Sequence, residues 1–144
     1  MNHSPVEVLR AALIEGLCGT SPSQTPGGAW PIFVSHLPET PDNAICVYDT
    51  AGVKDGRLMS GETIKHPGFQ VRVRATGYAN GFAQIEQIAI YLDTLHQEAV
   101  VVDGDSYRIV AVTQTSGPVS IGQEPDGKRR EGLTLNGTIT VQST

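Results

Sequence analysis

The sequence predicts an α+β fold in which two helices pack on one face of a largely antiparallel or mixed β-sheet. Three segments carry this prediction: an alternating strand at residues 70–76, an amphipathic helix at 80–96, and two strands joined by an acidic glycine turn between 123 and 130. The chain has 144 residues, of which 39% are hydrophobic, and this is enough for one apolar core. We therefore expect a single domain over residues 1–144.

Ser4 begins the first predicted helix, because its side chain can cap exposed backbone amides while Pro5 fits the first helical position and Glu7 completes a capping box. The apolar residues that follow recur at helical spacing: Val6, Leu9, Leu13 and Leu17. We expect Gly19 to end this helix, and the Gly, Pro and Ser content of residues 19–31 predicts a loop.

Residues 32–35 and 44–48 form two short β-like runs, separated by a proline-containing segment that predicts a turn or a sheet edge. Residues 49–67 contain three dipeptides that end in glycine and have almost no apolar periodicity. We interpret them as a protruding loop or hairpin arm, with Asp55-Gly56 as the candidate turn.

The second half of the chain has the clearest patterns. Apolar and polar residues alternate over 69–76, which predicts a strand with one buried face, and apolar residues then recur at helical spacing over 80–96 after a turn at Gly77-Tyr78. Residues 100–102 and 107–114 flank a candidate hairpin turn at 103–106. A long last strand runs from Leu133 to Val141, and Gly137 within it indicates a bulge.

Composition excludes several classes of function. The chain has 15 acidic and 10 basic residues, a net charge of -5, which argues against a surface that grips nucleic-acid phosphates. Two separated cysteines and four scattered histidines indicate reduced thiols and no metal site. No signal peptide and no apolar run of about 20 residues is present, so we expect no membrane role. Without a nucleophile elbow or a phosphate-binding glycine loop, we expect no enzyme and no cofactor.

Charged residues provide the candidate site. Arg72 and Arg74 project from the polar face of a strand, and Lys128-Arg129-Arg130 follows a turn. These side chains form either a solvated face or a subunit contact in which arginines pair with carboxylates across an interface. The candidate interface residues are Asp55, Arg57, Glu62, Arg72, Arg74, Glu124, Asp126, Arg129 and Arg130.

The order of several pieces resembles a known family. The pieces are Gln70-Val-Arg-Val-Arg, Gly77-Tyr78, the helix at 82–95, Tyr107-Arg-Ile-Val, Pro118 with Ile121-Gly122, Glu124-x-Asp126-Gly127-x-Arg129-Arg130, and the strand around Asn136. In this order they are similar to the minor capsid or tail terminator proteins of long-tailed bacteriophages. The resemblance covers about the last 80 residues well and the first 60 in outline.

The resemblance implies a small α+β protein without cofactor or catalysis that closes into a homo-oligomeric ring, commonly a hexamer. Such a ring caps a completed tail tube, stops tube polymerisation and presents a face to the head–tail connector. It implies a place at the head–tail junction of the virion, after assembly in the host cytoplasm, with the tail tube protein and the connector protein as partners. DNA would pass through the lumen without specific binding, which suits an acidic chain because acidic walls repel phosphate.

Two other classes of function stay open from sequence. One is a small α+β ligand-binding domain or enzyme with a pocket between helix 80–96 and the sheet, using Cys18, His36 or Tyr78 as polar groups. The other is an interaction module that adds a partner strand to an exposed sheet edge.

Overall fold

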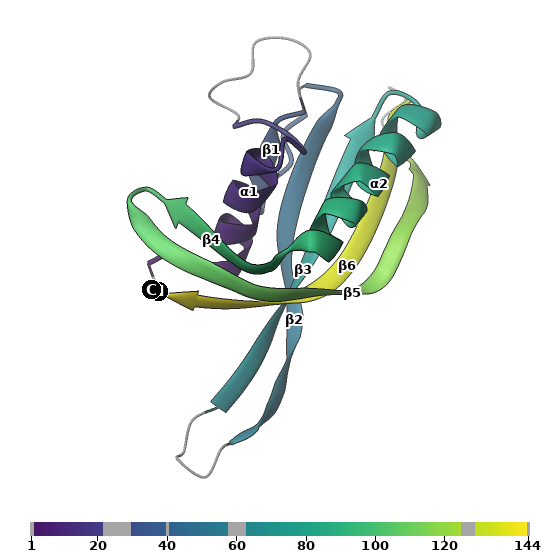
Figure 1. The fold of residues 1–144 in the computed structure, drawn as a ribbon. Coiled ribbons are helices and arrows are strands. Elements are labelled where there is room, and N and C mark those ends of the chain that lie inside the picture. The colour runs from purple at the N-terminus through teal and green to yellow at the C-terminus, as the bar shows by residue number, and fades with distance from the viewer. Residues whose placement is uncertain (1, 22–29, 40, 58–62, 125–128, 144) are drawn as a thin grey trace.

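The computed structural model describes residues 2–21, 30–39, 41–57, 63–124 and 129–143, and of residues 53–57 and 63–65 it describes the backbone. The elements are α1 Pro5–Glu15, β1 Ile32–Val34, β2 Ala44–Arg57, β3 Thr63–Ala75, α2 Tyr78–Thr94, β4 His96–Val102, β5 Asp105–Gln123 and β6 Glu131–Ser143. The strands form one sheet in the order β1-β2-β3-β6-β5-β4 (Figure 1). Strand β1 pairs with β2 in parallel and every other pair is antiparallel, which confirms the predicted α+β fold with a mixed sheet.

Helix α1 begins with the predicted capping box: the Glu7 amide donates to Ser4 Oγ at 3.3 Å, and the Ser4 amide donates to the Glu7 carboxylate. The helix ends earlier than predicted, at Glu15. Leu17 follows with φ 60°, the left-handed conformation of a helix C-terminus, and its side chain is 83% exposed. The prediction that Leu17 continues the buried stripe and that Gly19 ends the helix is therefore wrong.

Helix α2 starts two residues before the predicted helix, at Tyr78, so the expected turn at Gly77-Tyr78 is the helix start itself. At its other end His96 already belongs to β4. The apolar spacing of this helix predicts that Phe82 is buried with the other apolar residues, but Phe82 is 39% exposed, so this part of the prediction is wrong. Gly81 faces the sheet instead, and a Cβ there would lie 2.6 Å from Leu133 Cδ1, so only glycine lets the helix approach this closely.

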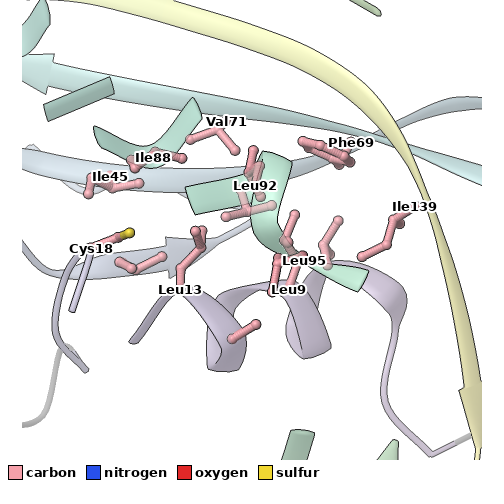
Figure 2. Close-up of a cluster of buried hydrophobic side chains, with 14 of the residues drawn as sticks. Leu9, Leu13, Cys18, Ile45, Phe69, Val71, Ile88, Leu92, Leu95 and Ile139 are labelled. Carbon is pink, nitrogen blue, oxygen red and sulfur yellow. The ribbon is translucent and has the colours of Figure 1, made fainter. Parts of the chain in front are cut away.

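The core lies between the two helices and one face of the sheet, which we call the inner face. Figure 2 shows side chains from both helices and from the sheet meeting in one cluster, among them Leu9, Leu13, Leu92, Ile45, Phe69, Val71 and Ile139. Each of these side chains is at most 1% exposed. Burying one such side chain contributes about 1.5–3 kcal/mol, so this contact holds the helices on the sheet.

Strands β2 and β3 extend past the sheet as a two-stranded arm, which we define as residues 51–57 and 63–67 (Figure 1). They pair with each other as far as Arg57 and Thr63. Strand β6, in contrast, pairs with β3 only over residues 68–75. The predicted hairpin arm is confirmed, but Asp55-Gly56 is not its turn, because both residues lie within β2 and the connection at 58–62 is outside the described residues.

Strand β5 is longer than predicted and strongly curved (Figure 1). Its pairing with β6 is irregular at four places, and each irregularity adds a residue to β5. The predicted hairpin turn between β4 and β5 is confirmed, with φ 49° at Asp103 and 85° at Gly104, as a two-residue turn requires.

Gly137 lies opposite one of these irregularities, so the bulge that it indicated is on β5 and not on β6. A Cβ at Gly137 would lie 2.5 Å from the Thr113 carbonyl oxygen and 2.8 Å from Phe69 Cζ. The glycine is therefore needed for the close approach of β5 and of the Phe69 ring.

We expect Gly137→Ala to lower the free energy of unfolding by about 1–3 kcal/mol, because a backbone oxygen cannot move aside for the added methyl group. Urea unfolding followed by circular dichroism measures this change. Gly117→Ala on β5 is the matched control: a Cβ there has nothing within 4 Å, and the expected change is within about 0.5 kcal/mol. Equal effects of the two substitutions would contradict the steric argument.

Candidate functional site

The candidate arginines lie on the face of the sheet opposite the core, which we call the outer face. The register places Arg72 beside Cys46 on one side and Thr134 on the other. Two residues along the strand, Arg74 is paired in the same way with Ala44 and Gly132. Because side chains alternate along a strand, both guanidinium groups leave β3 in the same direction.

Part of this outer face is covered by the chain itself. Arg74 is only 3% exposed, and its guanidinium donates to the backbone carbonyl oxygens of Asp42, at 3.2 Å, and of Pro41. Arg130 is 2% exposed and donates to the carbonyl oxygen of Glu39. These hydrogen bonds hold the segment that leads into β2 over the ends of β3 and β6.

Two carboxylates balance the arginines. Glu124 lies 2.9 Å from the Arg130 guanidinium and 3.8 Å from that of Arg72, and Asp42 lies 3.5 Å from Arg130. We call these four side chains, together with Arg74, the arginine network. Its three cations face two carboxylates within the described part of the chain, and burial, followed by the nearby charge of Arg130, lowers the pKa of Arg74.

The structure thus unites four of the nine candidate residues: Arg72, Arg74, Glu124 and Arg130. Arg129 is exposed beside them with φ 56°. Asp55 and Arg57 lie in the arm, on β2. The other two, Glu62 and Asp126, lie outside the described residues. Whether these side chains contact another subunit stays a prediction.

Sequence reasoning missed Asp42, which is part of the network. It lies 88 residues from Arg130 in the chain, so no local pattern connects the two. It also missed a polar cluster at the N-terminus, where His3 Nδ1 lies 2.8 Å from Tyr107 Oη and His3 Nε2 lies 3.4 Å from Asp103. This cluster attaches the start of the chain to the β4–β5 turn.

The groups proposed for a ligand pocket do not converge. Cys18 is buried after α1, whereas His36 is exposed after β1 and Tyr78 is exposed at the first turn of α2. Ile85, Ile88 and Leu92 fill the space between α2 and the sheet and are fully buried. A hollow of about 210 Å³ includes Cys18 but neither His36 nor Tyr78, and it is lined by Leu17, Cys18, Gly19, Thr20, Trp30 and Gln84.

The described residues also lack a metal centre and a membrane-spanning helix. They contain no group of three or more His, Cys, Asp or Glu side chains placed to hold a metal ion. None of their helices is long and apolar enough to cross a membrane.

Comparison with protein families gives a match over most of the chain. The model of a family described as "Bacteriophage tail terminator protein" matches residues 14–141. This chain belongs to the bacteriophage tail terminator family. The resemblance predicted from the order of sequence pieces is confirmed, and it extends into the first half of the chain.

A solved structure described as "Virion of native gene transfer agent (GTA) particle" contains a chain similar to this tail terminator. The identity is 16% and the TM-score 0.46, with 93% of this chain and 90% of that chain covered. A search of curated proteins found no match.

Family membership identifies this tail terminator as a structural protein of a phage tail and a component of the virion. It implies a non-enzymatic role, in agreement with the expectation from sequence. The functional surfaces of such a protein are those that contact other proteins of the assembly.

We expect Glu124→Gln to destabilise the protein by about 3 kcal/mol, because it removes the nearest carboxylate from the buried Arg130 guanidinium. Thermal and urea unfolding measure the change. Glu86→Gln, which removes the same charge from an exposed position of α2, is the control and should be nearly neutral. If Glu124→Gln is as mild as the control, the ion pairs do not hold the network together.

The buried thiols should be unreactive in the folded protein, in contrast to the nucleophile of a cysteine enzyme. Burial raises the pKa of Cys18 to about 11 and also raises the pKa of Cys46. At pH 8 we expect Cys18 to react with iodoacetamide roughly a hundredfold more slowly than a free thiol of pKa about 8.5, since only the thiolate reacts. Peptide mass spectrometry against a urea-unfolded control measures the rates.

The sign of the pH dependence follows from the raised pKa of Cys18. The contribution of the neutral Cys18 thiol to stability is fully present below the pKa that Cys18 has in the unfolded chain. It is lost as the pH rises towards about 11, the pKa of Cys18 in the folded protein. Labelling of the native protein should accelerate over the same range. Rapid labelling at pH 8 that does not depend on unfolding would show an activated cysteine.

Proposed function

We propose that this tail terminator forms a closed homo-oligomeric ring on the end of the tail tube, and we expect the ring to be a hexamer. The ring ends tube polymerisation and provides the joining surface for the head–tail connector. Family membership supports the place in the tail, and the observation that carries the ring is the arm of β2 and β3.

The arm suits a contact with a neighbour because, over residues 51–57 and 63–67, its strands have strand pairing only with each other. The pairing of β1 with β2 covers residues 45–47, and that of β6 with β3 starts at residue 68. A two-stranded hairpin alone is marginally stable in water, so an arm beyond the sheet gains stability from a second surface. In a ring, each subunit uses one surface to contact a different surface of the next, and the arm supplies the first of these.

The nine candidate residues take two roles in this proposal. We assign five of them to contacts between subunits: Asp55 and Arg57 on the arm, Arg129 shortly before β6, and Glu62 and Asp126, which lie outside the described residues. Arg72, Arg74, Glu124 and Arg130 support that contact from within, because the arginine network fixes the ends of β5 and β6 to β3.

The remaining partners follow from the place of the ring. One face contacts the tail tube protein and the other contacts the connector, at the head–tail junction, after assembly in the host cytoplasm. DNA passes through the lumen without specific binding. A net charge of -5 supports this, because an acidic wall does not hold phosphates.

We expect removal of the arm to abolish the ring and leave a folded monomer. Thr50 and Gly68 are paired across the hairpin, so an Asn-Gly turn can replace residues 51–67 between them. Light scattering coupled to size-exclusion chromatography, over a concentration series and with purified tail tubes, compares this variant with the full chain. Circular dichroism and thermal unfolding check that the core is retained.

Two results would contradict the proposal. If the shortened variant forms the same oligomer as the full chain, the arm is not the contact. If the full chain neither closes into a ring in solution nor binds the ends of tail tubes, the ring itself is wrong. A discrete oligomer of the full chain alone, with tube length limited by its addition, supports both parts.

A further inference from the structure

We infer that the distal half of β5 accepts the arm of a neighbouring subunit as an added strand, so that the sheets of adjacent subunits join. We call this part of the strand, residues 112–123, the β5 edge. The inference rests on the proposed ring and names its second surface. Three observations support it: the β5 edge has a partner strand on one side only, its sequence has no charged residue, and the arm projects from a different side of the subunit.

The β5 edge has a partner strand on one side only. Strand β4 pairs with β5 at residues 105–111 and is the last strand of the sheet. Beyond that point β5 continues for twelve residues, 112–123, and pairs with β6 alone. Among the described residues, no further backbone–backbone hydrogen bond reaches the open side. Its outward N–H and C=O groups can therefore pair with another chain.

The composition of the β5 edge is unusual for an exposed strand. No charged residue occurs over 109–123, although 17% of the chain is charged. Val119 and Ile121 are 51% and 52% exposed. Unpaired edges are normally protected by charged side chains, especially lysine, which prevent pairing with other chains. A long uncharged edge with exposed apolar side chains fits a surface that becomes covered on assembly.

Other features of the β5 edge restrict what can pair with it. Its bulges bend it, Pro118 has no amide hydrogen to donate, and the Gly122 amide already donates to Ser120 Oγ at 3.1 Å. These features disfavour the stacking of many flat strands. The stretch at 112–114 has no bulge and is long enough to start pairing with a short, projecting strand, while the Gln114 side chain donates to the carbonyl oxygen of Ala89 and to Asp93 on α2.

The arm of a second copy is the occupant we propose. In the described part of the arm, neither strand has a further strand paired along its outer side, so the arm also offers a backbone edge. In Figure 1 the arm leaves the bottom of the molecule, whereas the β5 edge curves along its right side. Two complementary edges on different sides of one subunit produce a head-to-tail contact, which closes into a ring when the rotation allows.

Amide hydrogen exchange of the full chain tests this inference directly, by comparing the dilute monomer with the assembled ring. We expect exchange at 112–123 and in the arm to slow together by at least about tenfold, the factor that corresponds to about 1.4 kcal/mol. Strand β4 is the internal control, and its exchange should not change. The arm-shortened variant should remain a monomer, in which those amides of 112–123 that point away from β6 stay unprotected.

A pair of matched variants gives an independent test. Val119→Lys places a charge on the β5 edge, and Val101→Lys makes the same change at the comparably exposed Val101, at 57%, on β4. Both should fold with unchanged thermal unfolding. We expect Val119→Lys to raise the concentration at which the ring forms by at least about tenfold, and Val101→Lys to leave it unchanged.

The outcomes separate this inference from the proposed ring. A ring that forms without slower exchange at 112–123, or that tolerates Val119→Lys, overturns the inference and leaves the ring intact. An oligomer of the shortened variant in which 112–123 is protected shows that the arm is not the occupant, and this also overturns it. Failure of the full chain to form a ring, alone or on tail tubes, overturns the proposed function and the inference with it.

Discussion

The register between β3 and β6 is the constraint on which the rest of the structure depends. These strands join the two halves of the sheet, and their pairing sets Val71 beside Leu135 and Phe69 beside Gly137 on the inner face. A shift by one residue would exchange the two faces, because side chains alternate along a strand. Arg72 and Arg74 would then point into the apolar core. The close packing of Phe69 on Gly137 is one of the contacts that forbid this shift.

The correct register has its own cost, since it buries charged groups on the outer face. Isolated buried cations are strongly destabilising, and the arginine network offsets this with carbonyl oxygens and two carboxylates. Its members come from three separate parts of the chain: the segment before β2, the C-terminal end of β3, and the ends of β5 and β6. The network therefore fixes one end of the central strands, while the arm extends from the other end.

Patterns within about 20 residues were sufficient to predict most elements. The capping box at Ser4, the alternation of β3 and the Asp103-Gly104 turn were all correct, because each depends on neighbours in sequence. Contacts between distant residues were not predictable in this way. Alternation showed that Arg74 faces away from the core, but not that Asp42 and its neighbours cover it. The turn placed at Asp55-Gly56 failed because pairing with β3 extends β2 past a dipeptide that otherwise favours a turn.

The strands are longer than the hydrophobic core requires, and the parts that extend beyond the core are the ones we propose for assembly. The inner face of the described sheet is already covered by α1 and α2, and the core cluster lies near the centre of β2, β3 and β6. The arm and the β5 edge lie beyond this region, and in the described chain the backbone groups on their open sides are left without a strand partner. Unpaired edges are a liability in a monomer, because they invite aggregation. In the proposed ring a neighbouring subunit covers this strand length, so the open strand edges, and not a cluster of side chains, are the assembly surfaces that we propose.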